Sequence, residues 1–270
     1  MPYQCPLCQQ LLEKNDHQWR CANNHQFDCA KEGYVNLMPV QHKHSKQPGD
    51  STEMMQARRA FLDQNYYQPL RDAVCHAIKV HMAPQTRCIL DIGCGEGYYT
   101  SEVAKQFSER DIAVFGLDIA KVAIRYAAKR YPTVSFCVAS SHRLPYADAS
   151  MDAVVRIYAP CKAEELARVI APQGILVTVS PAPRHLYQLK AQVYDSVQLH
   201  AENTETFEGF TLIDDQQLAY TMTLPGEQAA NLLQMTPFAW RATPDVAEAL
   251  RNNTEFECET DFAIRVYRRD

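Results

Sequence analysis

Two closely spaced pairs of metal-binding residues stand near the amino terminus. Cys5 and Cys8 form a C-x2-C pair, and twelve residues further on Cys21 and His25 form a C-x3-H pair. Two such pairs can bind one Zn2+ tetrahedrally. Cys29 is a rival fourth ligand, but the x3 spacing favours His25. Because four protein ligands leave no coordination position open for chemistry, the sequence predicts one structural zinc ion.

A second chemically suggestive set of residues is rich in glycine. Asp91, Gly93, Gly95 and Gly97 form a D-x-G-x-G-x-G pattern that follows a short apolar run. Alternating glycines let the backbone turn tightly beneath a ligand and present N–H groups to it. An acid just before this loop suits a cationic group such as an ammonium and would repel a pyrophosphate. Asp118 ends the next apolar run, where a carboxylate can accept both ribose hydroxyls of an adenosine.

The rest of the chain must position these residues, and its pattern predicts an α/β fold. Short apolar runs alternate with amphipathic stretches, which is typical of a mostly parallel sheet with helices on both faces. Ser51 is a predicted N-cap, and further helices are expected at about 69–80, 121–130 and 163–170. Seven strands are expected, at 88–92, 113–118, 134–138, 153–157, 175–179, 218–224 and 262–267.

Composition limits the class of protein. The chain has 270 residues, 46% of them hydrophobic and 22% charged, which is ordinary for a globular protein with one large and one small domain. No run of eighteen apolar residues occurs, and the first residues lack the layout of a signal peptide. The seven cysteines other than Cys5, Cys8 and Cys21 stand singly inside apolar segments, where isolated cysteines behave as small buried hydrophobes. We therefore expect a cytoplasmic protein with no membrane partner.

The charge is unevenly distributed. The net charge is −5, but residues 191–240 carry seven acids and neither Lys nor Arg. The segment between Asp118 and Asp148 carries five basic residues and no acid. Such asymmetry can steer a polyanion to one face of the molecule, although a solvated helix face would have the same composition.

The glycine-rich loop resembles motif I of class I S-adenosylmethionine-dependent methyltransferases. The resemblance implies a Rossmann-like fold and S-adenosylmethionine as cofactor, with Asp118 on the ribose. Ser140 stands where that family often has an Asp after its third strand. The other residues that the resemblance places around the cofactor are Tyr67, Asp91, Gly93, Gly95, Glu96, Ile119, Ser141, His142 and His185.

The zinc knuckle and the methyltransferase motif together resemble the bacterial 23S rRNA (guanine-N1)-methyltransferases. The resemblance spans essentially the whole chain, including residues 27–37, 157–161 and 235–240. It implies a 23S rRNA hairpin as substrate, guanine 745 rather than guanine 748 as target, and a homodimer. The implied domains are a zinc-binding RNA-recognition domain (1–40), a linker and helical lead-in (41–85) and the methyltransferase domain (86–270).

Three residues near the predicted cofactor site have more than one interpretation. Tyr158 follows the fourth predicted strand of the main domain, where it either contacts the purine or packs in the core. His185 either touches the cofactor or assists removal of the guanine N1 proton, or it lies in a surface loop. Tyr67 either closes over the cofactor or packs between helices. The sequence does not identify the catalytic base.

Two other functions compete with RNA methylation. A small-molecule methyltransferase with a zinc module for dimerisation would fit the acidic net charge. A non-enzymatic RNA-binding module would predict an eroded cofactor loop, whereas the loop and Asp118 are both intact. RNA binding that weakens as the salt concentration rises would distinguish RNA methylation from small-molecule methylation.

Overall fold

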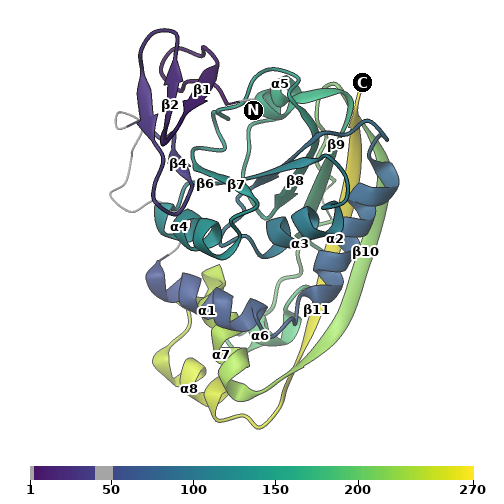
Figure 1. The fold of residues 1–270 in the computed structure, drawn as a ribbon. Coiled ribbons are helices and arrows are strands. Elements are labelled where there is room, and N and C mark those ends of the chain that lie inside the picture. Colours follow the sequence, from purple (N-terminus) through teal and green to yellow (C-terminus); the bar gives the residue numbers. More distant parts are fainter. Residues whose placement is uncertain (1–2, 40–50, 203) are drawn as a thin grey trace.

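The computed structural model describes residues 3–39, 51–202 and 204–270, so the predicted linker at 41–50 lies outside the described residues. Its main feature is a single large sheet (Figure 1). In spatial order the strands are β10 (Phe210–Leu224), β11 (Phe256–Arg269), β9 (Ile170–Pro181), β8 (Met151–Ile157), β5 (Cys88–Ile92), β6 (Ala113–Asp118), β7 (Ser135–Val138) and β4 (Val35–Asn36).

The order of the strands places a topological switch point at β5. The chain runs outward from β5 to β6 and β7, then returns to the other side of β5 to form β8 and β9. These strands are parallel, and Ile92 pairs with Leu117 on one side and Arg156 on the other. Ligands of open α/β sheets bind at the carboxyl ends of the strands beside such a reversal. Strand β11 runs antiparallel between β9 and β10.

The predicted fold class is confirmed, but the predicted number of seven strands is wrong. The eighth strand is β4, which pairs in parallel with the edge strand β7. It comes from the amino-terminal region and has only two residues. A segment this short has no alternating pattern, so sequence periodicity could not reveal it.

Most of the helices cover one face of the sheet, and one further helix packs on the opposite face. Ser51 caps α1 as predicted, since its side chain accepts a hydrogen bond from the Met54 backbone N–H at 3.2 Å. Apolar residues of α2, α3 and α4 pack on sheet residues such as Ile89, Val114 and Phe136. The helices are α1 (Thr52–Leu62), α2 (Gln68–His81), α3 (Tyr98–Gln106), α4 (Lys121–Arg130), α5 (Ala163–Val169), α6 (Tyr187–Ala191), α7 (Gly226–Gln234), the 3-10 helix η2 (Pro237–Trp240) and α8 (Pro244–Arg251).

Figure 1 shows α1, α6, α7 and α8 gathered at one end of the long β10–β11 pair. Among the described residues, no helix has the length and apolar character needed to cross a bilayer.

The amino-terminal module covers part of the opposite face. Its own sheet consists of β1 (Leu12–Asn15), β2 (Gln18–Cys21) and β3 (Gln26–Asp28). Tyr3 is almost fully buried, and its ring centroid lies 5.0 Å from that of Trp19, 5.9 Å from Phe115 and 5.3 Å from Tyr146. The backbone N–H of Gln4 also donates to the Pro145 carbonyl at 2.9 Å. The module and the main domain therefore share one apolar core, which α5 completes.

Candidate active site and zinc centre

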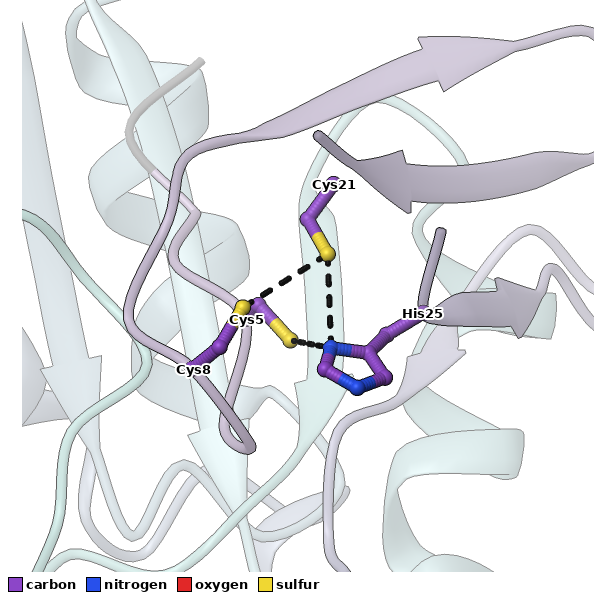
Figure 2. A group of neighbouring side chains, drawn as sticks. All are labelled: Cys5, Cys8, Cys21 and His25. Atoms are coloured by element: carbon purple, nitrogen blue, oxygen red, sulfur yellow. Dashed lines mark hydrogen bonds between the residues drawn. The ribbon is translucent and has the colours of Figure 1, made fainter. Parts of the chain in front are cut away.

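The four predicted zinc ligands converge at one point of the amino-terminal module (Figure 2). The His25 Nδ1 atom lies 3.5 Å from the Cys5 sulfur and 3.4 Å from the Cys21 sulfur. The sulfurs of Cys8 and Cys21 are 3.6 Å apart, and all four ligand atoms lie within 4.8 Å of one another. Among the described residues Cys29 is outside this group, so the geometry favours His25 over Cys29 as the fourth ligand.

These distances fit a tetrahedral zinc ion. Zinc–sulfur bonds of about 2.3 Å and a zinc–nitrogen bond of about 2.0 Å would separate two sulfurs by about 3.8 Å, and a sulfur from the nitrogen by about 3.5 Å. The Cys and His atoms already stand near these separations. Since all four positions are filled by protein atoms, a zinc ion here is structural.

The glycine-rich loop joins β5 to α3 at the switch point. Gly93, Gly95 and Gly97 all have left-handed backbone conformations, with φ of 73°, 54° and 84°. A Cβ on Gly93 would lie 2.5 Å from the Ala159 Cβ, whereas a Cβ on Gly95 would meet nothing within 4 Å. Glycine at position 93 therefore lets the segment after β8 approach the loop closely.

Asp118 fixes the conformation of this loop from the end of β6. One carboxylate oxygen accepts the Gly95 backbone N–H at 2.9 Å, and the other accepts the Ala120 N–H at 2.8 Å. A carboxylate at the end of this strand stands where the ribose of an adenosine is bound in dinucleotide folds. Ile119 follows directly and is 37% exposed, as an apolar surface for adenine would be.

Asp91 is buried beneath the loop. The Thr100 hydroxyl donates to its Oδ2 at 2.6 Å. Burial raises the pKa of Asp91 to about 7, with a further upward effect from Asp118 and a downward effect from the Thr100 hydrogen bond. A cation placed beside Asp91 would favour its ionised form.

Glu96 is held by a residue from α1. The Arg59 guanidinium donates to both of its carboxylate oxygens at 2.6 Å and also stacks over the Tyr126 ring, 4.1 Å from the centroid. A bidentate pair of this kind fixes direction as well as distance. Helix α1 is thereby attached to the loop and to α4.

On the other side of the loop, Tyr158 stands at the carboxyl end of β8. It has a left-handed φ of 55°, which is unusual for a residue other than glycine, and the residue is 47% exposed. Its backbone N–H donates to the Val179 carbonyl at 3.2 Å. The next residue, Ala159, is the one that lies against Gly93, so the backbone at Tyr158 is one residue from the closest approach to the loop.

His185 lies behind Tyr158 and is 6% exposed, so it is a buried residue and not a surface-loop one. The Tyr158 hydroxyl and the His185 Nε2 are 3.4 Å apart, and the Asp261 backbone N–H donates to Nδ1 at 3.2 Å. Burial, followed by the charges of His200 and Lys190, lowers the pKa of His185 to about 3. The imidazole is therefore neutral near pH 7 and too weak a base to remove the N1 proton of guanine.

Known proteins match both parts of the chain. A zinc-ribbon family model described as "RlmA, N-terminal" matches residues 3–46, and one described as "Methyltransferase domain" matches residues 86–231. The 23S rRNA (guanine(748)-N(1))-methyltransferase of Streptomyces fradiae is 31% identical, over 89% of this chain and 86% of its own. The chain belongs to the family of 23S rRNA (guanine-N1)-methyltransferases.

A second relative carries the same family name. The Bacillus subtilis protein YxjB, which carries a provisional name for the same reaction, is 28% identical over 98% of this chain and 96% of its own. The solved structure of YcgJ from Bacillus subtilis matches with a TM-score of 0.46 and 17% identity, covering 73% of this chain and 98% of that chain.

The remaining predicted residues of this methyltransferase differ in their placement. Tyr67 is buried, with its ring centroid 5.1 Å from that of Phe61 and 5.3 Å from Phe262, so it packs between elements behind Tyr158. Ser141 and His142 lie in the loop after β7. The Ser141 carbonyl accepts from the Cys161 thiol at 3.1 Å, which links that loop to the segment after β8.

Two contacts of the guanine-N1-methyltransferase site were missed by the sequence interpretation. Thr100 lies three residues after Gly97, in the first turn of α3, and could have been noticed as a hydroxyl close to the loop. Arg59 is 37 residues from its partner Glu96, and nothing in the local sequence connects them.

Proposed function

We propose that this enzyme transfers the methyl group of S-adenosylmethionine to N1 of a guanine in 23S rRNA. The main structural support is the close approach of Ala159 to Gly93, which brings the end of β8, with Tyr158, to the glycine-rich loop. The same chain also has the Cys and His cluster of a zinc ribbon. Family membership supports the same reaction. S-adenosylmethionine would supply an electrophilic methyl group on a sulfonium, and the protein supplies position and charge.

The described residues fit this cofactor. Asp118 would accept the ribose hydroxyls, and Ile119 would pack on the adenine. The backbone of Gly93 and Gly95 would line the methionine part together with Glu96, and Asp91 would supply negative charge toward its ammonium. Ser141 and His142 would border the adenine from the loop after β7, and His185 and Tyr67 would support the site from behind Tyr158.

RNA would bind across α4 and the amino-terminal module. Four basic side chains of α4 are exposed, namely Lys121, Arg125, Lys129 and Arg130. A surface hollow of about 440 Å³ lies between this helix and the module, lined by Lys31, Glu32, Ala128, Lys129 and Pro132. Basic side chains next to a hollow suit a phosphate backbone.

Further details rest on the family resemblance. We propose a hairpin as substrate, guanine 745 as target, a homodimer that widens the RNA-binding surface, and a cytoplasmic location. One relative is named for guanine 748, so the experiment must distinguish guanine 745 from guanine 748 as the target. We propose the division into 1–40, 41–85 and 86–270 as a division of functions. It is not a division into separate hydrophobic cores, because the first and last parts share one core.

The test is methyl transfer from labelled S-adenosylmethionine to 23S rRNA from cells that lack this modification. Label recovered as 1-methylguanosine at one hairpin position supports the proposal and identifies the target. The Asp118→Asn variant, which keeps the shape of the side chain, should bind the cofactor more weakly and label the RNA more slowly. Cofactor binding with no label in RNA would refute the proposal in favour of a small-molecule acceptor.

A further inference from the structure

The strained conformation of Tyr158 is held by contacts on both sides. A left-handed conformation costs a residue with a side chain about 1–2 kcal/mol, and such strain is concentrated at functional sites. Here the Val179 carbonyl accepts a hydrogen bond from the Tyr158 N–H, and Ala159 packs closely against Gly93. The result is a half-exposed phenol fixed at the carboxyl end of β8, beside the cofactor loop.

The hydrogen bonds around His185 determine which way the Tyr158 hydroxyl donates. Nδ1 accepts the Asp261 backbone N–H, so in the neutral ring the proton is on Nε2. Nε2–H therefore donates to the Tyr158 hydroxyl oxygen, at a long 3.4 Å. With its oxygen accepting from His185, the hydroxyl directs its own hydrogen elsewhere, and no second partner for it is recorded among residues 3–39, 51–202 and 204–270.

The loop that carries His185 is itself fixed. The Asp261 carboxylate accepts the Arg184 backbone N–H at 3.0 Å and the Gln217 side-chain amide at 2.7 Å. The Ala182 N–H donates to the Asp261 carbonyl at 2.9 Å. The charged and titratable groups around the pair are Lys190 and His200 near the imidazole, and Tyr67, Tyr99, Tyr220 and Asp261 near the phenol.

We propose that Tyr158 donates its hydroxyl hydrogen to O6 of the target guanine, and that His185 is the positioning residue that orients this hydroxyl. This inference rests on the proposed function. As N1 loses its proton to solvent, negative charge spreads to O6, and a donor aimed there stabilises the anion. The N1–methyl bond then forms as the methyl–sulfur bond breaks, leaving neutral 1-methylguanine and a neutral thioether.

The same hydrogen bond would select guanine over adenine. O6 of guanine accepts a hydrogen bond, whereas the amino group at the corresponding position of adenine donates one. A hydroxyl whose oxygen already accepts from His185 is poorly placed to accept from that amino group as well. Tyr158 is therefore a specificity-determining residue as well as a catalytic one.

The experiment compares Tyr158→Phe with wild type on rRNA that lacks the modification. The rate at saturating RNA should fall about 10²-fold near neutral pH, the typical effect of removing one oxyanion donor. The loss should shrink as pH rises to about 9, because N1 then deprotonates with less help. S-adenosylmethionine affinity should be unchanged, and Tyr194→Phe, which removes a hydroxyl beside Phe238, should behave as wild type.

Substitutions of His185 test the positioning role. Gln can accept from the Asp261 N–H and donate to Tyr158, so His185→Gln should retain most of the rate. His185→Leu can do neither, so it should lose rate with the same pH dependence as Tyr158→Phe. Unfolding curves for each variant separate this effect from loss of the fold.

Two results would overturn the assignment of Tyr158. One is a loss in Tyr158→Phe that stays constant at every pH, and the other is a loss that lies wholly in RNA affinity, as stacking alone would give. A wild-type enzyme that leaves the RNA unlabelled while binding cofactor overturns the proposed function, and the role of Tyr158 with it.

Discussion

The contact between Gly93 and Ala159 permits a stability prediction with an internal control. Gly93→Ala and Gly95→Ala make the same change in the same loop, and both positions have left-handed backbones. Each substitution should cost about 1–2 kcal/mol for that conformation alone. Only the first creates a steric clash, since its Cβ would lie 2.5 Å from the Ala159 Cβ.

The clash should add to the cost at position 93. Carbon atoms in contact normally lie about 3.5–4.0 Å apart. Inserting a methyl group into a space this small typically costs about 1–3 kcal/mol. We therefore expect Gly93→Ala to lower the free energy of unfolding by about 2–5 kcal/mol and Gly95→Ala by about 1–2 kcal/mol, measured by urea unfolding without cofactor.

A double-mutant cycle isolates the contact. Ala159→Gly removes the clashing Cβ and leaves the Ala159 Cα at 3.7 Å, which is an ordinary contact. In the Gly93→Ala background it should restore about 1–3 kcal/mol, whereas in the Gly95→Ala background it should restore nothing. Equal costs at the two glycines, or no restoration at position 93, would refute the reasoning.

Three further predictions follow from other parts of the molecule. Because the pKa of Asp91 is raised from 3.8 to about 7, the native state holds more protons than the unfolded chain between these values. Stability should therefore fall as pH rises from about 4 to about 7, and Asp91→Asn should lack that part of the slope in urea unfolding. Cys8→Ser should lose zinc and lower the melting temperature, whereas Cys29→Ser should retain zinc, as measured by metal analysis. Lys129→Ala should weaken RNA binding and reduce the salt slope of log affinity by about 1 in a filter-binding titration.

Each of these can fail in a defined way. A pH slope that is unchanged in Asp91→Asn would mean that another group carries it. Loss of zinc in Cys29→Ser would show that Cys29 is a zinc ligand and that the proposed set of four ligands is wrong. A salt slope unaffected by Lys129→Ala would place the RNA elsewhere on the surface.

Much of the fold followed from local patterns in the sequence. The zinc ligands obey a fixed spacing because each pair sits on one tight turn, so Cys5, Cys8, Cys21 and His25 could be identified before their geometry was known. The buried parallel strands are recognisable in the sequence as short apolar runs. Strand β4 is not recognisable in this way, because its two residues form a strand through their pairing with β7.

The parts that could not be predicted depend on contacts between distant segments. Tyr158 and Tyr67 are both tyrosines near predicted element ends, yet one is half-exposed and the other buried. His185 is covered by the distant strand β11, where the Asp261 N–H donates to its ring and the Phe262 ring lies 4.7 Å away. Burial and partners of this kind decide whether a residue can act, and they come from tertiary packing.

The shared core of the zinc module also has a consequence for folding during synthesis. The ribosome makes Tyr3 and Trp19 long before Phe115 and Tyr146, the rings on which Tyr3 packs. A nascent chain folds from its amino terminus as it emerges, so the module must keep its shape before its apolar partners exist. Zinc binding supplies that interim stability, since all four ligands lie between Cys5 and His25, well before Phe115 in the chain. In a zinc-starved cell, the emerging chain would instead present an unfolded apolar segment until the main domain is nearly complete.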